Sequence, residues 1–215
     1  MKFFSVDGGL YKFISRLWDV IKLNFLWLLF SLPIVTMGAA TVAAYSVTLK
    51  MVDDAEGYVA RQFVKAFKEN LKQGIPLGLI FLFCSYVVYL DFELFQKVEG
   101  NPIYLLAFGI VAAFIFTMAF IYAFPLSARY ENTLSGTIKN SVNIATRYFL
   151  RTLALVAVLA VEVVVFLFNS TTMLFGILIG PVCIMFTISG FAMHFFREIE
   201  KEPGAVTQTE EEKEN

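Results

Sequence analysis

Five long apolar runs restrict this chain to a membrane fold. A helix needs about 20 mostly apolar residues to cross the hydrocarbon core of a bilayer. Five stretches approach or exceed that length: Asn24 to Leu49, Ile75 to Leu90, Ile103 to Pro125, Leu150 to Phe168 and Met173 to Phe196. Charged residues make up only 16% of the chain, whereas soluble domains carry roughly a quarter. Runs this long satisfy their backbone as helices and not as barrel strands. The sequence therefore predicts an all-α, polytopic membrane helix bundle with five transmembrane helices.

The residues before the first run predict a separate amphipathic helix. Between Gly8 and Lys22, apolar residues recur at spacings of three and four, with charged residues between them. Such a helix lies in the membrane interface or packs as a cap on the bundle. We therefore divide the chain into an amphipathic segment (1–22), a transmembrane bundle (23–198) and an acidic tail (199–215). The tail is predicted to be disordered, because it is polar and has no apolar face to bury.

Lysine and arginine residues predict the orientation, since they concentrate in cytoplasmic segments. If all five runs cross the membrane, most of the 17 lysines and arginines lie on the side of the C-terminal tail. We therefore expect a multi-pass protein of the plasma membrane with a cytoplasmic C-terminus and an N-terminus outside. The basic N-terminal helix argues against the outside N-terminus. A first run that turns back near Pro33 and Gly38 would put both of its ends in the cytoplasm, although each arm would be short.

A weak internal repeat emerges when the chain is shifted by 75 residues. The stretch from Phe63 to Phe81 then overlies the stretch from Ile138 to Val156. Each copy consists of a basic amphipathic helix followed by a span, so we predict a duplicated two-helix unit whose copies share one orientation. The basic helices either simply flank the spans, or bind anionic headgroups or a partner protein.

Small residues mark two of the runs as packing surfaces. Helices associate in lipid largely through close backbone approach, which small residues permit. Gly38, Ala39 and Ala43 lie in the second half of the first run, and Gly176 and Gly180 form a GxxxG pair in the fifth. These faces either pack within the bundle or dock another membrane protein.

One ionisable residue lies inside a predicted span. Glu162 is costly in hydrocarbon, which makes it a candidate functional residue. It also lies near the turn that contains Asn169, so the alternative is that it snorkels to the outer interface. Under the repeat it corresponds to Val87, and the lack of a polar counterpart argues against a transporter with matched sites in both halves.

Motifs for enzyme chemistry are missing from the sequence. It contains no P-loop, no GxSxG and no HExxH. The single histidine, His194, is interpreted as packed or interfacial, and Cys84 and Cys183 lie inside runs without metal-ligand spacing. We therefore predict that the protein is not an enzyme, with no catalytic residue, no metal, no cofactor and no nucleic-acid partner.

Two stretches, "SLPIVTMGAATVAAY" and "EGYVARQFVKAFKENLKQG", carry a family pattern. That pattern has Asn and Trp in the first span, here Asn24 and Trp27, and then a Leu-Pro-x-x-Thr-x-Gly turn. A Phe-x-x-Phe-Lys-x-Asn-x-x-Gln helix follows, whose core Phe67, Lys68 and Asn70 match. The chain thus resembles the YesL-like family of Gram-positive integral membrane proteins, a domain of unknown function, over most of its length.

The resemblance implies a role in sugar uptake, because members are commonly encoded with carbohydrate ABC importers and sugar-degrading enzymes. It also implies a bundle of five or six helices. We predict a non-catalytic accessory subunit associated with the permeases of an ABC importer of oligosaccharides, with those permeases and membrane lipid as partners. A small stand-alone transporter or channel for a sugar-related solute is the alternative. The candidate partner-binding residues are Gly38, Ala39, Ala43, Phe67, Lys68, Asn70, Gly176 and Gly180.

Overall fold

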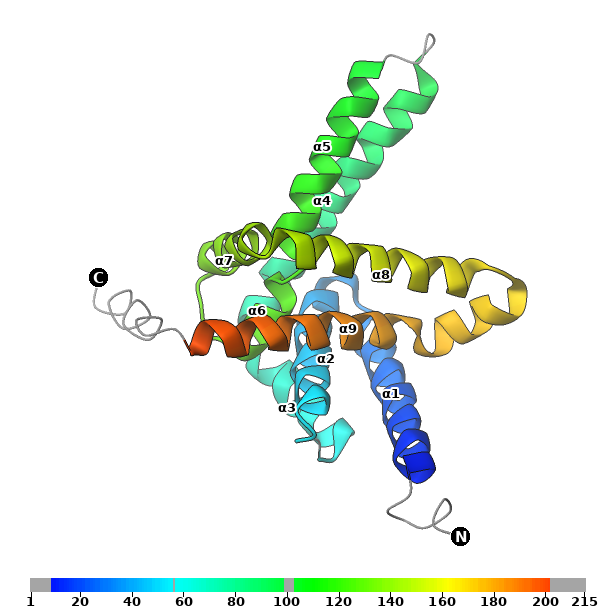
Figure 1. The fold of residues 1–215 in the computed structure, drawn as a ribbon, viewed down its shortest axis with the longest axis vertical. Helices are drawn as coiled ribbons and strands as arrows, with labels where there is room; N and C mark the ends of the chain where they lie inside the picture. Colours follow the sequence, from blue (N-terminus) through cyan, green and yellow to red (C-terminus); the bar gives the residue numbers. More distant parts are fainter. Residues whose placement is uncertain (1–8, 56, 99–102, 202–215) are drawn as a thin grey trace, which may run out of the picture.

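The computed structural model describes residues 9–55, 57–98 and 103–201, and the regular structure in these ranges is entirely helical (Figure 1). This confirms the predicted all-α bundle. Most of the predicted acidic tail lies outside the described residues. The elements are α1 (Gly9–Ser31), a 3-10 turn η1 (Ile34–Thr36), α2 (Met37–Val52), α3 (Val59–Glu69), α4 (Leu71–Lys97), α5 (Ile103–Phe120), α6 (Ala123–Arg129), α7 (Leu134–Arg147), α8 (Phe149–Leu167) and α9 (Ser170–Glu200).

Five segments of the described chain are long and apolar enough to cross a membrane, as predicted. They contain η1 with α2, then α4, then α5 with α6, then α8, and finally α9. The first of these differs from the rest, because 61% of its apolar window is buried inside the protein, against 11–28% in the other four. The α2 segment is therefore the core of the molecule, and the other four present most of their surface outward.

The first predicted run is two helices and not one. Helix α1 continues past Lys22 without a break and ends at Ser31, so the predicted boundary at residue 22 is wrong. Pro33 ends the helix because it lacks an N–H and disfavours helical geometry in the residue before it. The Thr36 hydroxyl donates to the Phe30 carbonyl at 2.8 Å and satisfies an end of α1 that Pro33 left open.

After this turn α2 runs back along α1. The indole of Trp27 on α1 donates to Thr41 Oγ1 on α2 at 3.1 Å, and Arg16 near the start of α1 pairs with Asp54 just after α2. The contact nearer the turn joins residues close in sequence, and the contact farther from the turn joins residues far apart. This pattern shows that the two helices are antiparallel. The prediction of one helix from Asn24 to Leu49 is therefore wrong, and the alternative that the chain turns back near Pro33 is correct.

Small residues let α4 approach α2 to backbone contact. A Cβ placed on Gly38 would lie 2.1 Å from the carbonyl oxygen of Gly74 and 2.5 Å from the Cα of Gly78. A Cβ on Gly74 would lie 2.5 Å from the Cα of Ala39. Ala39, Ala40, Ala43 and Ala44 are fully buried on the same helix. The alanines and glycines of α2 thus form the central helix seam of the protein.

The predicted repeat is visible in the order of the helices. In the first copy α3 leads through the single residue Asn70 into α4, and in the second α7 leads through the single residue Tyr148 into α8. Helices α3 and α7 begin at Val59 and Leu134, which are separated by the predicted shift. Gln73 joins the copies by donating to the Asn132 carbonyl at 2.8 Å.

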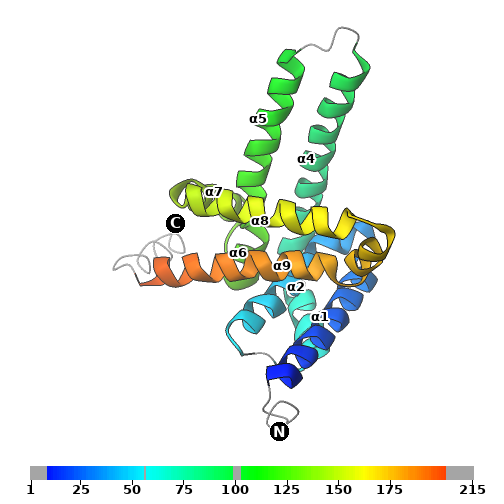
Figure 2. The ribbon, with the colours of Figure 1, turned by 45° about the vertical axis from the view of Figure 1, so that its right-hand side comes forward.

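Each copy ends in a helical hairpin, and the two hairpins diverge. The α4/α5 hairpin rises from the body, whereas the α8/α9 hairpin leaves it in a different direction (Figures 1 and 2). The body at their base contains α2, packed against α1, α3, α4, α6 and α9. We refer to α4/α5 as the first hairpin and α8/α9 as the second.

The α2–α4 seam yields a stability prediction. Gly78→Ala should lower the free energy of unfolding by about 1–3 kcal/mol or more, because its Cβ would overlap the backbone of Gly38 and the helices must separate. The matched control is Gly190→Ala in α9, whose Cβ would meet nothing within 4 Å. Thermal unfolding in detergent measures both variants. An unchanged melting temperature for Gly78→Ala would contradict the seam.

Candidate functional site

A cavity of about 390 Å³ lies at the base of the two hairpins. Its walls come from α1, α2 and both hairpins, and they are mostly phenylalanine, leucine, isoleucine and methionine. Three of its polar side chains are already hydrogen-bonded: Trp27 donates to Thr41 at 3.1 Å, Thr41 to the Met37 carbonyl and Thr117 to the Ala113 carbonyl, both at 2.8 Å. Tyr45 is the remaining side chain of the lining with a polar group, so the hydroxyls of a buried sugar would find few partners, at a cost in free energy. The cavity suits hydrocarbon.

Glu162 faces the interior of the second hairpin. Its Oε1 accepts a hydrogen bond from the Thr187 hydroxyl at 2.7 Å, and its Oε2 is buried without a donor. Thr187 lies in the middle of α9 and far from the turn at Asn169. The snorkelling alternative is therefore wrong, because the carboxylate turns toward α9 and not toward the outer interface.

Asp91 has a comparable position in the first hairpin. It lies in the second half of the outgoing helix α4, as Glu162 does in α8. Its Oδ2 is also buried without a donor, and a Cβ on Gly109 of α5 would lie 2.4 Å from that oxygen. Although the shift of 75 residues pairs Glu162 with Val87, the structure places one inward-facing carboxylate in each hairpin. A buried acceptor without a donor costs about 1–3 kcal/mol, so such atoms need an explanation.

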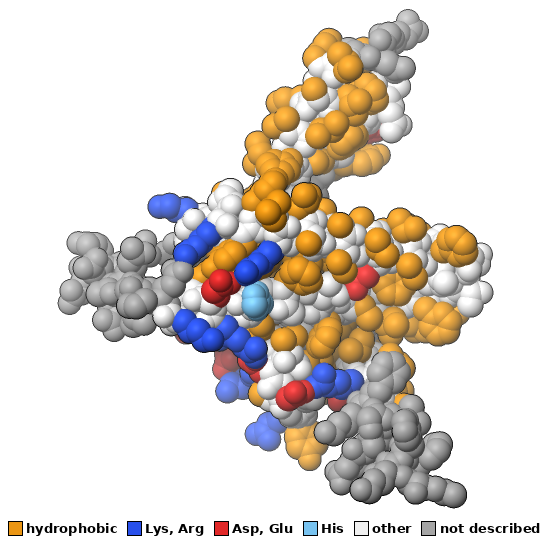
Figure 3. Space-filling model, viewed as in Figure 1, with side chains coloured by type: hydrophobic (Ala, Val, Ile, Leu, Met, Phe, Trp, Pro, Cys, Tyr) orange, Lys and Arg blue, Asp and Glu red, His pale blue; other side chains and the backbone are white. Residues whose placement is uncertain are grey.

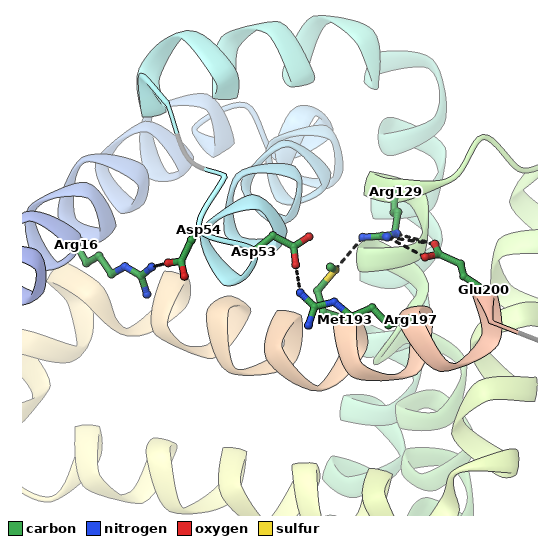
Figure 4. A network of polar contacts seen from close by, with 7 residues as sticks. All are labelled: Arg16, Asp53, Asp54, Arg129, Met193, Arg197 and Glu200. Atoms are coloured by element: carbon green, nitrogen blue, oxygen red, sulfur yellow. Dashed lines mark hydrogen bonds and ion pairs between the residues drawn. The ribbon is translucent and has the colours of Figure 1, made fainter.

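Ion pairs join the helix ends on one side of the molecule (Figure 4). Arg16 pairs with Asp54, and Arg197 of α9 pairs with the adjacent Asp53. Arg129 of α6 contacts both carboxylate oxygens of Glu200, at 3.1 and 3.2 Å. These contacts draw α1, α2, α6 and α9 together at a common end.

A second set of contacts lies at the same end. Arg151 of α8 pairs with Glu198 at 2.7 Å. Tyr130 donates to Glu200, and burial together with that carboxylate raises the pKa of Tyr130 to about 12. His194 is exposed, with Nε2 3.9 Å from Glu198, which fits an interfacial residue. Lysine and arginine side chains gather on this side, away from the tips of the hairpins (Figure 3).

The small residues proposed for docking lie inside the protein. Gly38, Ala39 and Ala43 are buried against α4 and its neighbours, so the hypothesis of a partner surface there is wrong. Gly176 and Gly180 face the ring of Phe166 on α8, which places the GxxxG pair in the seam of the second hairpin. Both faces serve helix packing within the chain, which was the other interpretation.

The remaining docking candidates on α3 are mostly internal too. The Phe67 ring lies 4.8 Å from the Phe30 ring of α1, and Asn70 donates to the Ala66 carbonyl at 2.8 Å, at the end of its own helix. Lys68 is exposed and stays accessible. Two further polar residues of the hairpin region were given no structural role by the sequence: Asn24 of the family pattern, which donates to the Ile177 carbonyl at 3.0 Å, and Thr187. Glu162 was identified because it is a polar residue within an apolar run, and the same criterion would have identified both of these residues.

The fold and these sites define the class: a polytopic helical membrane protein with two outward-facing hairpins on a buried α2. A family model described as a protein of unknown function, DUF624, matches residues 20–92. The "Uncharacterized protein YesL" of Bacillus subtilis (strain 168) is 26% identical over 175 residues, covering 80% of this chain and 83% of YesL. No solved structure gives a significant match. Both sequence matches agree with the resemblance to the YesL-like family, and the family model covers the part of the chain that runs from α1 to α4.

The Glu162–Thr187 contact yields a second prediction. Thr187→Val should destabilise the second hairpin by about 1–2 kcal/mol, because it removes the donor that the described part of the chain gives to Glu162. Thr187→Ser keeps the hydroxyl and is the matched control. Adding Glu162→Leu to Thr187→Val should restore stability, since replacing both partners by apolar groups is nearly neutral. Melting temperatures of the parent and the three variants test this, and a double variant no more stable than Thr187→Val would refute the contact.

Proposed function

We propose that this protein is a non-catalytic accessory subunit in the membrane, associated with the permease subunits of an ABC importer for carbohydrates. The observation that carries the proposal is the pair of diverging hairpins. Their outer faces expose large apolar side chains, including Phe83, Phe108, Val164 and Phe175, while the chain's own core is confined to their base. Such faces suit contact with the helices of another membrane protein as well as with lipid.

The chemistry of the cavity favours an accessory role over transport of a sugar. A sugar-binding site needs several convergent hydrogen-bonding groups. The cavity at the base of the hairpins offers aromatic and aliphatic walls, and its Trp and Thr groups bond within the chain. The link to carbohydrate importers comes from the family resemblance.

A stand-alone transporter is the second candidate, and one observation favours it. Transporters carry polar groups at corresponding depths in their repeats. Asp91 and Glu162 each lie on the outgoing helix of one hairpin, and each has a buried oxygen without a donor. Uptake of a labelled sugar by vesicles that contain only the purified chain would favour this candidate.

We also propose that the end with the ion pairs is cytoplasmic. Among the described lysines and arginines of the loops and helix ends, Lys97 alone lies at the tip of a hairpin. The others lie toward the base, which fits the excess of positive charge on cytoplasmic segments. A fluorescent reporter that fails after export should therefore light when it is fused after α9. If that fusion stays dark, and a fusion at the same site to a phosphatase that works only after export is active, the orientation is the opposite one.

Photo-crosslinking tests the partner proposal. A benzophenone side chain placed at Phe83, Phe108, Val164 or Phe175 should form covalent adducts with permease subunits in native membranes, because these positions face outward. The matched control is Phe195, which is fully buried at the base and should form no adduct with another protein. Adducts are identified by mass spectrometry after purification of the full chain.

The pattern across positions separates the outcomes. Adducts with permeases from one or both hairpins support the accessory role and show which hairpin docks. Adducts with lipid alone, together with no permease in the purified material, would exclude it. Adducts from Phe195 would indicate that the chain had unfolded.

A further inference from the structure

Helix α1 carries an apolar stripe that the rest of the chain leaves uncovered. Ile14, Trp18, Phe25 and Leu29 follow one another at spacings of four and seven, so they share one face of the helix, and Leu32 comes directly after the helix end. All are exposed, from 47% at Leu29 to 75% at Leu32. Lys22, four residues after Trp18 and three before Phe25, is a charged and exposed residue at the edge of this row. The opposite face of α1 packs on α2, α3 and α9.

The stripe continues around the turn and onto the first hairpin. Ile34 and Val35 of η1 are exposed at 69% and 52%, and η1 packs against α4. On α4 the exposed residues Leu79 and Ile80 follow, and they belong to a segment able to cross a membrane. The stripe is therefore continuous with the surface that the first hairpin presents to lipid.

The polar groups of α1 are arranged for an interface. Arg16 forms an ion pair with Asp54, and this contact holds the early part of α1 at the basic end of the protein. Lys22 binds Asp19 at 3.1 Å and lies 5.6 Å from the centre of the Trp18 ring. Tryptophan and lysine together mark the level of lipid headgroups, since each joins an apolar body to a polar tip.

The direction of α1 argues against a crossing helix. It slants away from both hairpins in the view of Figure 1, and it is absent from the segments whose length and composition suit a span. The contact between Arg16 and Asp54, and the pairing of Asp53 with Arg197, keep the early part of α1 near the inner ends of α2 and α9.

We propose that the α1 stripe and the η1 turn form a monotopic membrane anchor. Their partner is the lipid bilayer itself, on the leaflet at the basic end. The stripe rests among the upper acyl segments, with Arg16 and Lys22 at the headgroups, as amphipathic interfacial helices do. The start of α1 then lies on the same side of the membrane as the end of α9. This inference is independent of any importer.

Tryptophan fluorescence tests the depth of the stripe. The chain has two tryptophans, so Trp27→Phe leaves Trp18 as the reporter, and Trp18→Phe leaves the half-buried Trp27 as the matched control. The full chain is reconstituted in vesicles of phosphatidylcholine and phosphatidylglycerol brominated near the headgroup or near the bilayer centre. Trp18 should lose most of its emission to shallow bromines, clearly less to deep ones, and little to aqueous iodide.

Two results would overturn the anchor. Strong quenching of Trp18 by iodide with little effect of either brominated lipid means that the stripe is in water. Strongest quenching by deep bromines means that α1 crosses the bilayer. Because Trp27→Phe removes a hydrogen bond to Thr41, its melting temperature is compared with that of the parent protein first. The labelling experiment below does not depend on this variant.

Cysteine labelling tests the side of the membrane. In a variant with Cys84→Ala and Cys183→Ala, single cysteines are introduced by Ser15→Cys at the start of α1, Lys201→Cys after α9, and Lys97→Cys at the tip of the first hairpin. An impermeant maleimide is applied to intact and to lysed cells. Ser15→Cys should react like Lys201→Cys and unlike Lys97→Cys. Reaction of Ser15→Cys together with Lys97→Cys would refute the proposal.

Discussion

The close approach of α2 and α4 is the contact on which the rest of the structure depends. In lipid, helices are not driven together by the hydrophobic effect, so they associate where backbones can come near. Gly38 meets Gly74 and Gly78 at distances that no side chain would tolerate. This seam holds α2 at the centre, and α2 in turn contacts α1, α3, α6 and α9. The alanines of α2 also allow close packing, because leucines at these positions would keep the neighbouring helices farther from α2.

The molecule combines a dense base with two exposed hairpins. Aromatic contacts and ion pairs concentrate where α2, α6 and the end of α9 meet, as in the stacking of Tyr148 on Phe195 at 4.7 Å and the Arg129–Glu200 pair. Away from the base, each hairpin is held mainly by contacts between its own two helices. Hairpins built in this way can face lipid or another protein without rearrangement of the core. Their inward-facing carboxylates, Asp91 and Glu162, are the exception to this apolar character and the strongest reason to consider a transport role.

Particular residues show how far sequence reasoning reached. The five apolar runs, the amphipathic α3 and α7 and the shift between them were predictable, because hydrophobic periodicity is local. The turn at Pro33 was visible as a possibility. The reversal of the chain at this turn depends on the Thr36–Phe30 hydrogen bond. It also depends on the ion pair between Arg16 and Asp54, which are far apart in sequence. The role of Gly38, Ala39 and Ala43 was undecided for the same reason, since a small-residue face suits an internal seam and an external one equally.

Composition, run length and charge placement follow from residue chemistry, so they are enough to predict a helical membrane protein with a duplicated unit and a basic side. The folded chain was needed to show that α1 and α2 are antiparallel, that α2 is the core and that Glu162 turns to Thr187. The divergence of the two hairpins is also visible in the fold alone. These features depend on which helix faces meet, and in a chain that is apolar on nearly every face the hydrophobic pattern carries little information about that choice.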